Sequence, residues 1–70
     1  MDVILYTTKC PKCNVLEAKL KNKNISYLAV SDIEIMKEKG FMQAPVLEVD
    51  GVTMDFVIAN NWINAQKGNN

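Results

Sequence analysis

The residues best suited to chemistry in this chain are its two cysteines, Cys10 and Cys13, which stand three positions apart with Pro11 directly after the first. A pair spaced in this way can act as a redox switch, supply half of a metal site, or serve only as packed thiols or a short disulfide. Thiol–disulfide exchange needs a thiolate that attacks, a sulfur that is accessible, and a second thiol that resolves the mixed disulfide. The surroundings of the two sulfurs decide among these kinds of site.

The position of Cys10 favours its thiolate. Pro11 suits the first turn of a helix, so the sulfur before it would face unpaired backbone N–H groups and the positive end of a helix dipole. Lys9 and Lys12 add positive charge nearby, and the sequence has no His that could act as a base. We therefore expect this local field to activate Cys10, as it does in other CxxC sites.

Cys13 has a different environment from Cys10. It shares an apolar stripe with Leu16 and Leu20 at helical spacing, so we expect it to be more buried and more protonated than Cys10. These environments assign Cys10 as the attacking thiolate and Cys13 as the resolving thiol.

Two other roles for the cysteine pair stay open. A purely structural disulfide is the first, although a disulfide across so short a loop restricts the unfolded chain little. A thiolate metal site is the second, but a closed zinc site needs four ligands, and the sequence offers no His and no third Cys. We therefore expect no metal site.

Hydrophobic patterning places the cysteines in an α/β domain. The apolar run at residues 3–6 predicts a strand buried on both faces, and residues 11 to 23 follow it as an amphipathic helix that ends near Asn24. Residues 25–30 are a second strand candidate, parallel to the first. The cysteines then lie where a strand ends and a helix begins, which is where open α/β sheets commonly keep functional sites.

The second half of the chain continues the alternation of predicted strands and helices. A Ser-x-x-Glu capping box starting at Ser31 opens a short helix that Gly40 ends. An Asp-Gly turn joins strands at residues 46–49 and 52–54, and Asp55 caps a last helix. The order β-α-β-α-β-β-α predicts an α/β fold with a mixed four-stranded sheet flanked by three helices.

The last helix carries the only tryptophan. Trp62 lies among Ile58, Ala59 and Ile63, which favours packing in or near the core over a role as a docking aromatic. The tail at residues 68–70 is expected to fray.

Composition limits the kind of protein further. Seventy residues make one domain, residues 1–70, and a chain of this size buries only about 60% of its unfolded surface. Eight Lys offset eight Asp and Glu, which argues against a nucleic-acid partner. The first apolar run is too short for a signal peptide or a membrane span, so we expect a cytoplasmic protein, where paired cysteines are more often catalytic or metal-binding than structural.

A second group of residues precedes the third strand. Gln43, Ala44 and Pro45 lead into it, and proline suits a strand start because it cannot donate to the ladder. Since only about 5–6% of X–Pro bonds in folded proteins are cis, these residues alone favour a trans peptide bond before Pro45.

Three motifs together resemble those of the glutaredoxins: CPKC after the first strand, Ala44-Pro45-Val46 before the third, and the Asp-Gly hairpin. The stretch from Gly40 to Val46 is especially similar to the NrdH-redoxin branch, whose members donate electrons to ribonucleotide reductase. The resemblance implies a thioredoxin-like fold and a monomeric dithiol–disulfide oxidoreductase that needs no cofactor. It also implies that the substrate is a protein disulfide, such as that of ribonucleotide reductase.

The resemblance also implies roles for single residues. Pro45 would be cis and pack beside the two sulfurs, and Ala44 would offer backbone groups to an extended substrate segment, with Gln43 beside it. Asp55 would bind the amino group of glutathione, whereas its alternative role is that of a helix cap. Residues 52–56 lack the glycine pair of glutathione-using members but keep Asp55, so glutathione and thioredoxin reductase are both candidate reductants.

Overall fold

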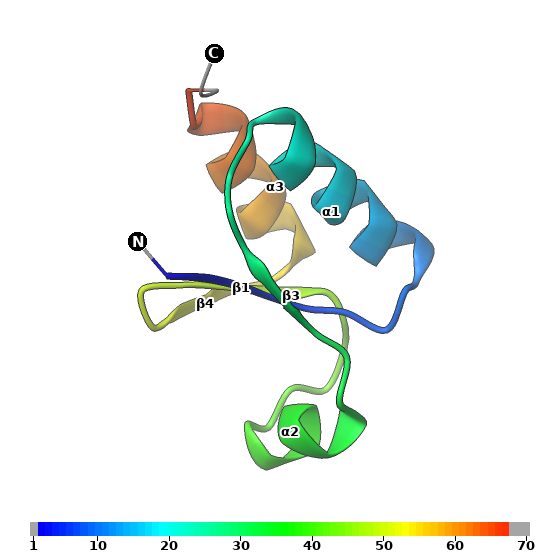
Figure 1. Ribbon diagram of the computed structural model, residues 1–70. Coiled ribbons are helices and arrows are strands. Elements are labelled where there is room, and N and C mark those ends of the chain that lie inside the picture. The colour runs from blue at the N-terminus through cyan, green and yellow to red at the C-terminus, as the bar shows by residue number, and fades with distance from the viewer. Residues whose placement is uncertain (1, 68–70) are drawn as a thin grey trace.

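A four-stranded sheet separates two helices on one face from a short helix on the other (Figure 1). The computed structural model describes residues 2–67. The order of elements is the predicted one: β1 (Val3–Tyr6), α1 (Pro11–Asn22), β2 (Leu28–Val30), α2 (Ile33–Glu38), β3 (Val46–Val49), β4 (Val52–Met54) and α3 (Phe56–Ala65).

The sheet has the strand order β2-β1-β3-β4, with β1 parallel to β2 and antiparallel to β3. The hairpin of β3 and β4 turns at Asp50 and Gly51, whose φ angles of 49° and 87° fit the predicted Asp-Gly turn. Tyr6, the last residue of β1, lies opposite Val46, the first residue of β3. This register brings the loop after β1 beside the loop before β3.

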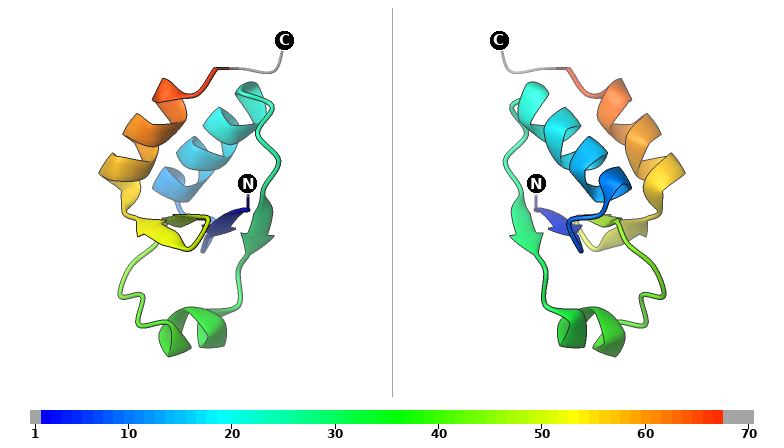
Figure 2. Two further views of the ribbon diagram at one scale, coloured as in Figure 1. Left: turned by 90° about the vertical axis from the view of Figure 1, so that its left-hand side faces the viewer. Right: turned by 90° about the vertical axis from the view of Figure 1, so that its right-hand side faces the viewer.

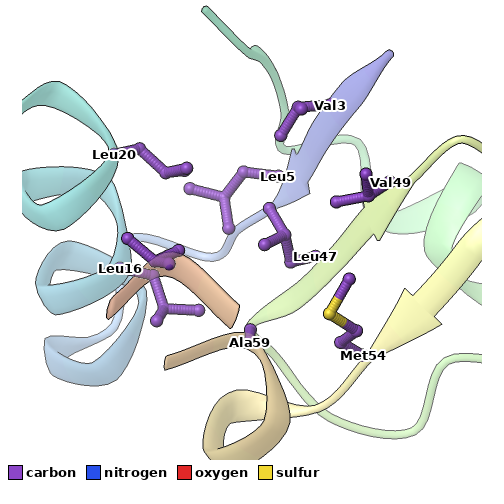
Figure 3. Packing of buried hydrophobic residues seen from close by; sticks show 9 residues of the cluster. Val3, Leu5, Leu16, Leu20, Leu47, Val49, Met54 and Ala59 are labelled. Atoms are coloured by element: carbon purple, nitrogen blue, oxygen red, sulfur yellow. The ribbon is translucent and has the colours of Figure 1, made fainter. Parts of the chain in front are cut away.

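The main core lies between the sheet and the pair α1 and α3, which Figure 2 shows side by side over the same face. Leu16 and Leu20 point from α1 toward Leu5 and Leu47 on the central strands (Figure 3). All four leucine side chains are fully buried, as is Ile63 of α3. Each such side chain stabilises the fold by about 1.5–3 kcal/mol on burial, so this face holds α1 in place.

The opposite face of the sheet has a smaller cluster beneath α2. Met36 of α2 packs there with Tyr6 and Val46, and the ring of Phe41 meets the ring of Tyr6 edge-on at 4.9 Å. This contact anchors the chain between α2 and β3, the segment that leads to Ala44 and Pro45.

Two predicted boundaries are wrong. The second strand begins at Leu28 rather than residue 25, because the N–H of Ile25 donates to the carbonyl of Leu20 and so closes α1 instead of pairing with β1. The cap of α2 is Asp32 rather than Ser31, since the Asp32 carboxylate accepts the N–H of Glu34 at 2.9 Å.

The helix ends follow the prediction more closely. Asn24 and Gly40 both have left-handed φ angles, 57° and 79°, just after α1 and α2. Trp62 is half-buried against the main core as expected, whereas Ile58 is 56% exposed. The predicted fraying concerns residues 68–70, which lie outside the described residues. No helix within residues 2–67 has the length and apolar character needed to cross a membrane.

Candidate functional site

Cys10 is the N-cap residue of α1, at the point where the loop after β1 enters the helix. Its carbonyl accepts the N–H of Asn14 at 2.9 Å, which begins the helical hydrogen bonds. Its sulfur accepts the backbone N–H of Cys13 at 3.2 Å, in the manner of a capping oxygen. Pro11 occupies the first helical position, and the first turn has no acidic residue. The Cys10 sulfur therefore lies at the positive end of the helix dipole.

The turn before Cys10 is fixed to the sheet. Lys9 adopts a left-handed φ of 64°, and its N–H donates to the side-chain oxygen of Thr7 at 3.0 Å. Thr7 is 2% exposed, and its own N–H donates to the carbonyl of Val30 at 2.9 Å. The backbone of Lys9 thus helps to position Cys10, independently of the charge on the Lys9 side chain.

A disulfide joins Cys10 and Cys13, whose Cα atoms are 5.0 Å apart. Cys13 is only 1% exposed, whereas Cys10 is partly exposed, so the predicted difference in burial is confirmed. The hydroxyl of Thr8 lies 3.9 Å from the Cys13 sulfur. A partner approaching from solvent would meet the sulfur of Cys10 and not that of Cys13.

The loop before β3 approaches the same sulfur. The carbonyl oxygen of Ala44 lies 4.0 Å from Cys10 Sγ. The Ala44–Pro45 peptide bond is cis, and Pro45 is buried. The trans bond expected from the residues alone is therefore wrong, and the cis bond implied by the resemblance is confirmed. General frequencies of X–Pro isomers do not describe a tight turn at the start of a strand.

A groove of about 380 Å³ opens beside this loop. Its walls come from the start of α1, the loop before β3, the end of β4 and the start of α3. The residues that matter most for its chemistry are Lys12, Gln43, Ala44, Pro45, Asp55 and Phe56. Ala44 both lines the groove and approaches Cys10, so the groove begins next to the accessible sulfur.

Lys12 and Asp55 are the charged residues that line the groove. The Lys12 ammonium lies 5.4 Å from the centre of the Phe56 ring, a cation–π contact between α1 and α3. Asp55 is the N-cap of α3, and one of its carboxylate oxygens accepts the N–H of Ile58 at 2.9 Å. The capping role of Asp55 is confirmed, and its exposed side chain also faces the groove.

The structure thus brings most of the predicted site residues together. The groove collects Lys12, Gln43, Ala44, Pro45 and Asp55, whereas Lys9 and Pro11 shape the backbone before and after Cys10. Phe56 and the 98% exposed Met42 also line the groove but were not predicted. Only their nearness to Asp55 and to the proline loop would have indicated them.

A hydrogen bond near the middle of α1 helps to hold this helix over the sheet. The hydroxyl of Tyr27 donates to the carboxylate of Glu17 at 2.8 Å. This bond lowers the pKa of Glu17, helped by the nearby positive charges of Lys9 and Lys21. Burial and the same carboxylate raise the pKa of Tyr27 to about 12. This hydrogen bond connects the segment before β2 to α1.

The described residues contain no group of three or more His, Cys, Asp or Glu side chains that could hold a metal ion. Cys10 and Cys13 are joined in a disulfide, and no third side chain of these kinds from residues 2–67 lies with them. A closed site of four protein ligands is not present in this part of the chain.

Comparison with known proteins adds no relative: no protein-family model, curated protein or solved structure matches this chain. The chemistry of the site follows from its own geometry. Its elements are two cysteines joined by a disulfide, a helix N-terminus under the accessible sulfur, and a groove that begins beside it.

Proposed function

We propose that this protein is a small dithiol–disulfide oxidoreductase of thioredoxin-like fold that reduces disulfides in other proteins. The observation that carries the proposal is the unequal pair itself: Cys10 is partly exposed at a helix N-terminus, and Cys13, its disulfide partner, is buried one turn further on. Exchange chemistry requires this combination of an accessible sulfur and a second thiol within reach.

The reaction begins from the dithiol form. The Cys10 thiolate attacks one sulfur of the target disulfide, and the other target sulfur leaves as a thiolate that takes up a proton. Cys13 then loses its proton and attacks Cys10, which releases the second target thiolate and forms the Cys10–Cys13 disulfide. Two electrons have passed to the target, so an external reductant must reduce the protein again.

The site supports the first step by stabilising negative charge on Cys10. The N–H of Cys13 already points at the Cys10 sulfur, and the first turn of α1 brings no carboxylate near it. Such a sulfur ionises more readily than a free cysteine, which makes it both a better nucleophile at neutral pH and a better leaving group.

The groove supports a peptide substrate. An extended segment with its cysteine at Cys10 would run past the backbone of Ala44 and along the groove lined by Gln43 and Asp55. We propose that the protein acts as a monomeric electron donor of the glutaredoxin or NrdH-redoxin kind, with ribonucleotide reductase as a candidate target. It needs no bound cofactor for this chemistry, although glutathione is a candidate co-substrate.

The function is tested by NADPH-coupled reduction of a protein disulfide with two recharging systems, one containing thioredoxin reductase and the other glutathione with glutathione reductase. Turnover with the first alone supports an NrdH-redoxin role. Turnover with the second alone supports a glutathione-dependent role, in which Asp55 contacts glutathione as well as capping α3.

Direct chemical reduction makes the test independent of the upstream enzyme. The protein is reduced with dithiothreitol, freed of reagent and mixed with a protein disulfide substrate. We expect substrate thiols to appear at two per protein molecule. If the reduced protein transfers no electrons to any disulfide substrate, the proposal is wrong.

A further inference from the structure

The contact between Lys12 and Phe56 places a positive charge at the groove. A lysine side chain at the start of an exposed helix turn is normally free to move through many rotamers. Here the ammonium lies over the Phe56 ring at 5.4 Å, and the ring itself packs against the main core. The ring face attracts the cation and so restricts where it stands.

Lys12 is the cation of this groove, and Lys9 is not. Lys9 does not line the groove, and it lies near enough to Glu17 to help to lower the pKa of that carboxyl group. No carboxylate among residues 2–67 lies within ion-pair distance of the Lys12 ammonium. Asp55, which directly precedes Phe56, already accepts the N–H of Ile58 with one oxygen. The charge on Lys12 is therefore available to a ligand.

We propose that Lys12, positioned by Phe56, makes the protein prefer disulfide substrates that carry a carboxylate next to the attacked cysteine. This inference rests on the proposed function and names a substrate class for it. Lys12 follows Cys10 by two residues, and Ala44 lines the same groove while approaching the Cys10 sulfur. A segment that binds along the groove with its sulfur at Cys10 therefore passes Lys12.

The size of the preference follows from simple electrostatics. A single pair of opposite charges near a protein surface changes a rate by about fivefold, and salt screens the attraction over a Debye length of about 10 Å at 0.1 M. A cation already held in place loses less side-chain freedom when the substrate arrives, so the ring of Phe56 increases the effect.

The test compares three peptides that differ only in the residue after the cysteine, which is Glu, Gln or Lys. Each peptide cysteine is joined by a disulfide to the same small neutral thiol, and the second-order rate of attack by the reduced protein is measured. At low salt we expect the Glu peptide to react about fivefold faster than the neutral Gln peptide, and the Lys peptide about fivefold slower than the Gln peptide. The difference should shrink toward none in 1 M salt.

Variants separate positioning from packing. Lys12→Met should bring the Glu-to-Lys rate ratio close to one, and Phe56→Leu should reduce this ratio by a larger factor than it changes the rate of the Gln peptide. Phe56→Tyr keeps an aromatic face and should keep the ratio. Lys21→Met, which removes the same charge from the other end of α1, is the matched control and should leave all three rates unchanged.

Failures of the two proposals look different. If the Glu and Lys peptides react at equal rates and the Gln peptide is also attacked, the proposed preference for a carboxylate is wrong, but the oxidoreductase function is still supported. No attack on any peptide would overturn the function itself. If Phe56→Leu slows all three peptides by the same factor, Phe56 only packs against the core, and its positioning role is wrong.

Discussion

At the scale of single residues, one helical turn separates two sulfurs with different roles. Cys10 caps α1 and is reached from solvent, while Cys13 lies on the stripe of α1 that faces the core. The backbone N–H of Cys13, in the first turn of the helix, is aimed at the Cys10 sulfur at 3.2 Å. The division of roles therefore comes from helix geometry and needs no neighbouring base.

The bond between Tyr27 and Glu17 predicts a dependence of stability on pH. Folding raises the pKa of Tyr27 to about 12, so its contribution is complete below the ordinary tyrosine pKa of about 10 and is lost as pH rises through 12. Folding lowers the pKa of Glu17, so its contribution is present above about pH 4.3 and is lost as pH falls through the folded-state value. Chemical denaturation across this pH range measures both losses.

The matched variants are Tyr27→Phe and Tyr6→Phe. Tyr27→Phe should lower the free energy of unfolding by about 1 kcal/mol at neutral pH and remove part of the alkaline loss. Tyr6 makes a long 3.5 Å contact with Glu48 and leaves the Tyr27 bond intact, so Tyr6→Phe should keep that loss. Identical alkaline profiles for wild type and Tyr27→Phe would contradict the assignment.

Single residues were predictable where their role is local. The spacing of Cys10 and Cys13 predicted the pair, and the stripe shared with Leu16 predicted which sulfur is buried. The contact of Lys12 with Phe56 was not predictable, because it joins residues 44 positions apart and depends on how α1 and α3 pack. Patterns along the chain carry no information about such a contact.

At the scale of elements, the start of α3 forms one wall of the groove. Asp55 caps this helix and Phe56 follows it, so the cap fixes both the helix and the ring under Lys12. Asp55→Ala should lower the free energy of unfolding by about 1 kcal/mol, because the N–H of Ile58 loses its acceptor.

Asp55→Asn is the control for this cap. Asn caps about as well as Asp, so the variant should keep most of the stability in urea denaturation. Equal destabilisation by Ala and Asn would mean that the charge of Asp55, and not its capping hydrogen bond, stabilises α3.

Element boundaries show where sequence patterns fail. Residues 25–30 look like one strand, but Ile25 and Tyr27 make their hydrogen bonds to α1, and only Leu28–Val30 pair with β1. Ser31 and Asp32 are both favourable N-cap residues. The structure has Asp32 in this role, because its side chain accepts the N–H of Glu34. The element order was predictable because hydrophobic periods are local, whereas these choices depend on packing.

At the scale of the whole molecule, one small core must hold every part of the site. A domain of this size has a total stability of roughly 4–10 kcal/mol. Leu47 lies on a central strand and is fully buried, so Leu47→Ala should cost about 2–5 kcal/mol, a large part of the total.

The edge strand β4 supplies the comparison for the core. Val52 is 63% exposed, so Val52→Ala should change the free energy of unfolding by less than about 0.5 kcal/mol. Urea denaturation measures both variants. A cost at Val52 equal to that at Leu47 would contradict the account of the core.

The measurement that tests the central claim most directly is the capture of the mixed disulfide. Reduced Cys13→Ser and reduced Cys10→Ser proteins are each mixed with a peptide disulfide, and intact mass is recorded. Because Cys10 attacks and Cys13 resolves, Cys13→Ser should accumulate a covalent adduct with the mass of one peptide thiol, whereas Cys10→Ser should form little or none. Equal adducts on both variants, or an adduct on Cys10→Ser alone, would contradict the assigned roles.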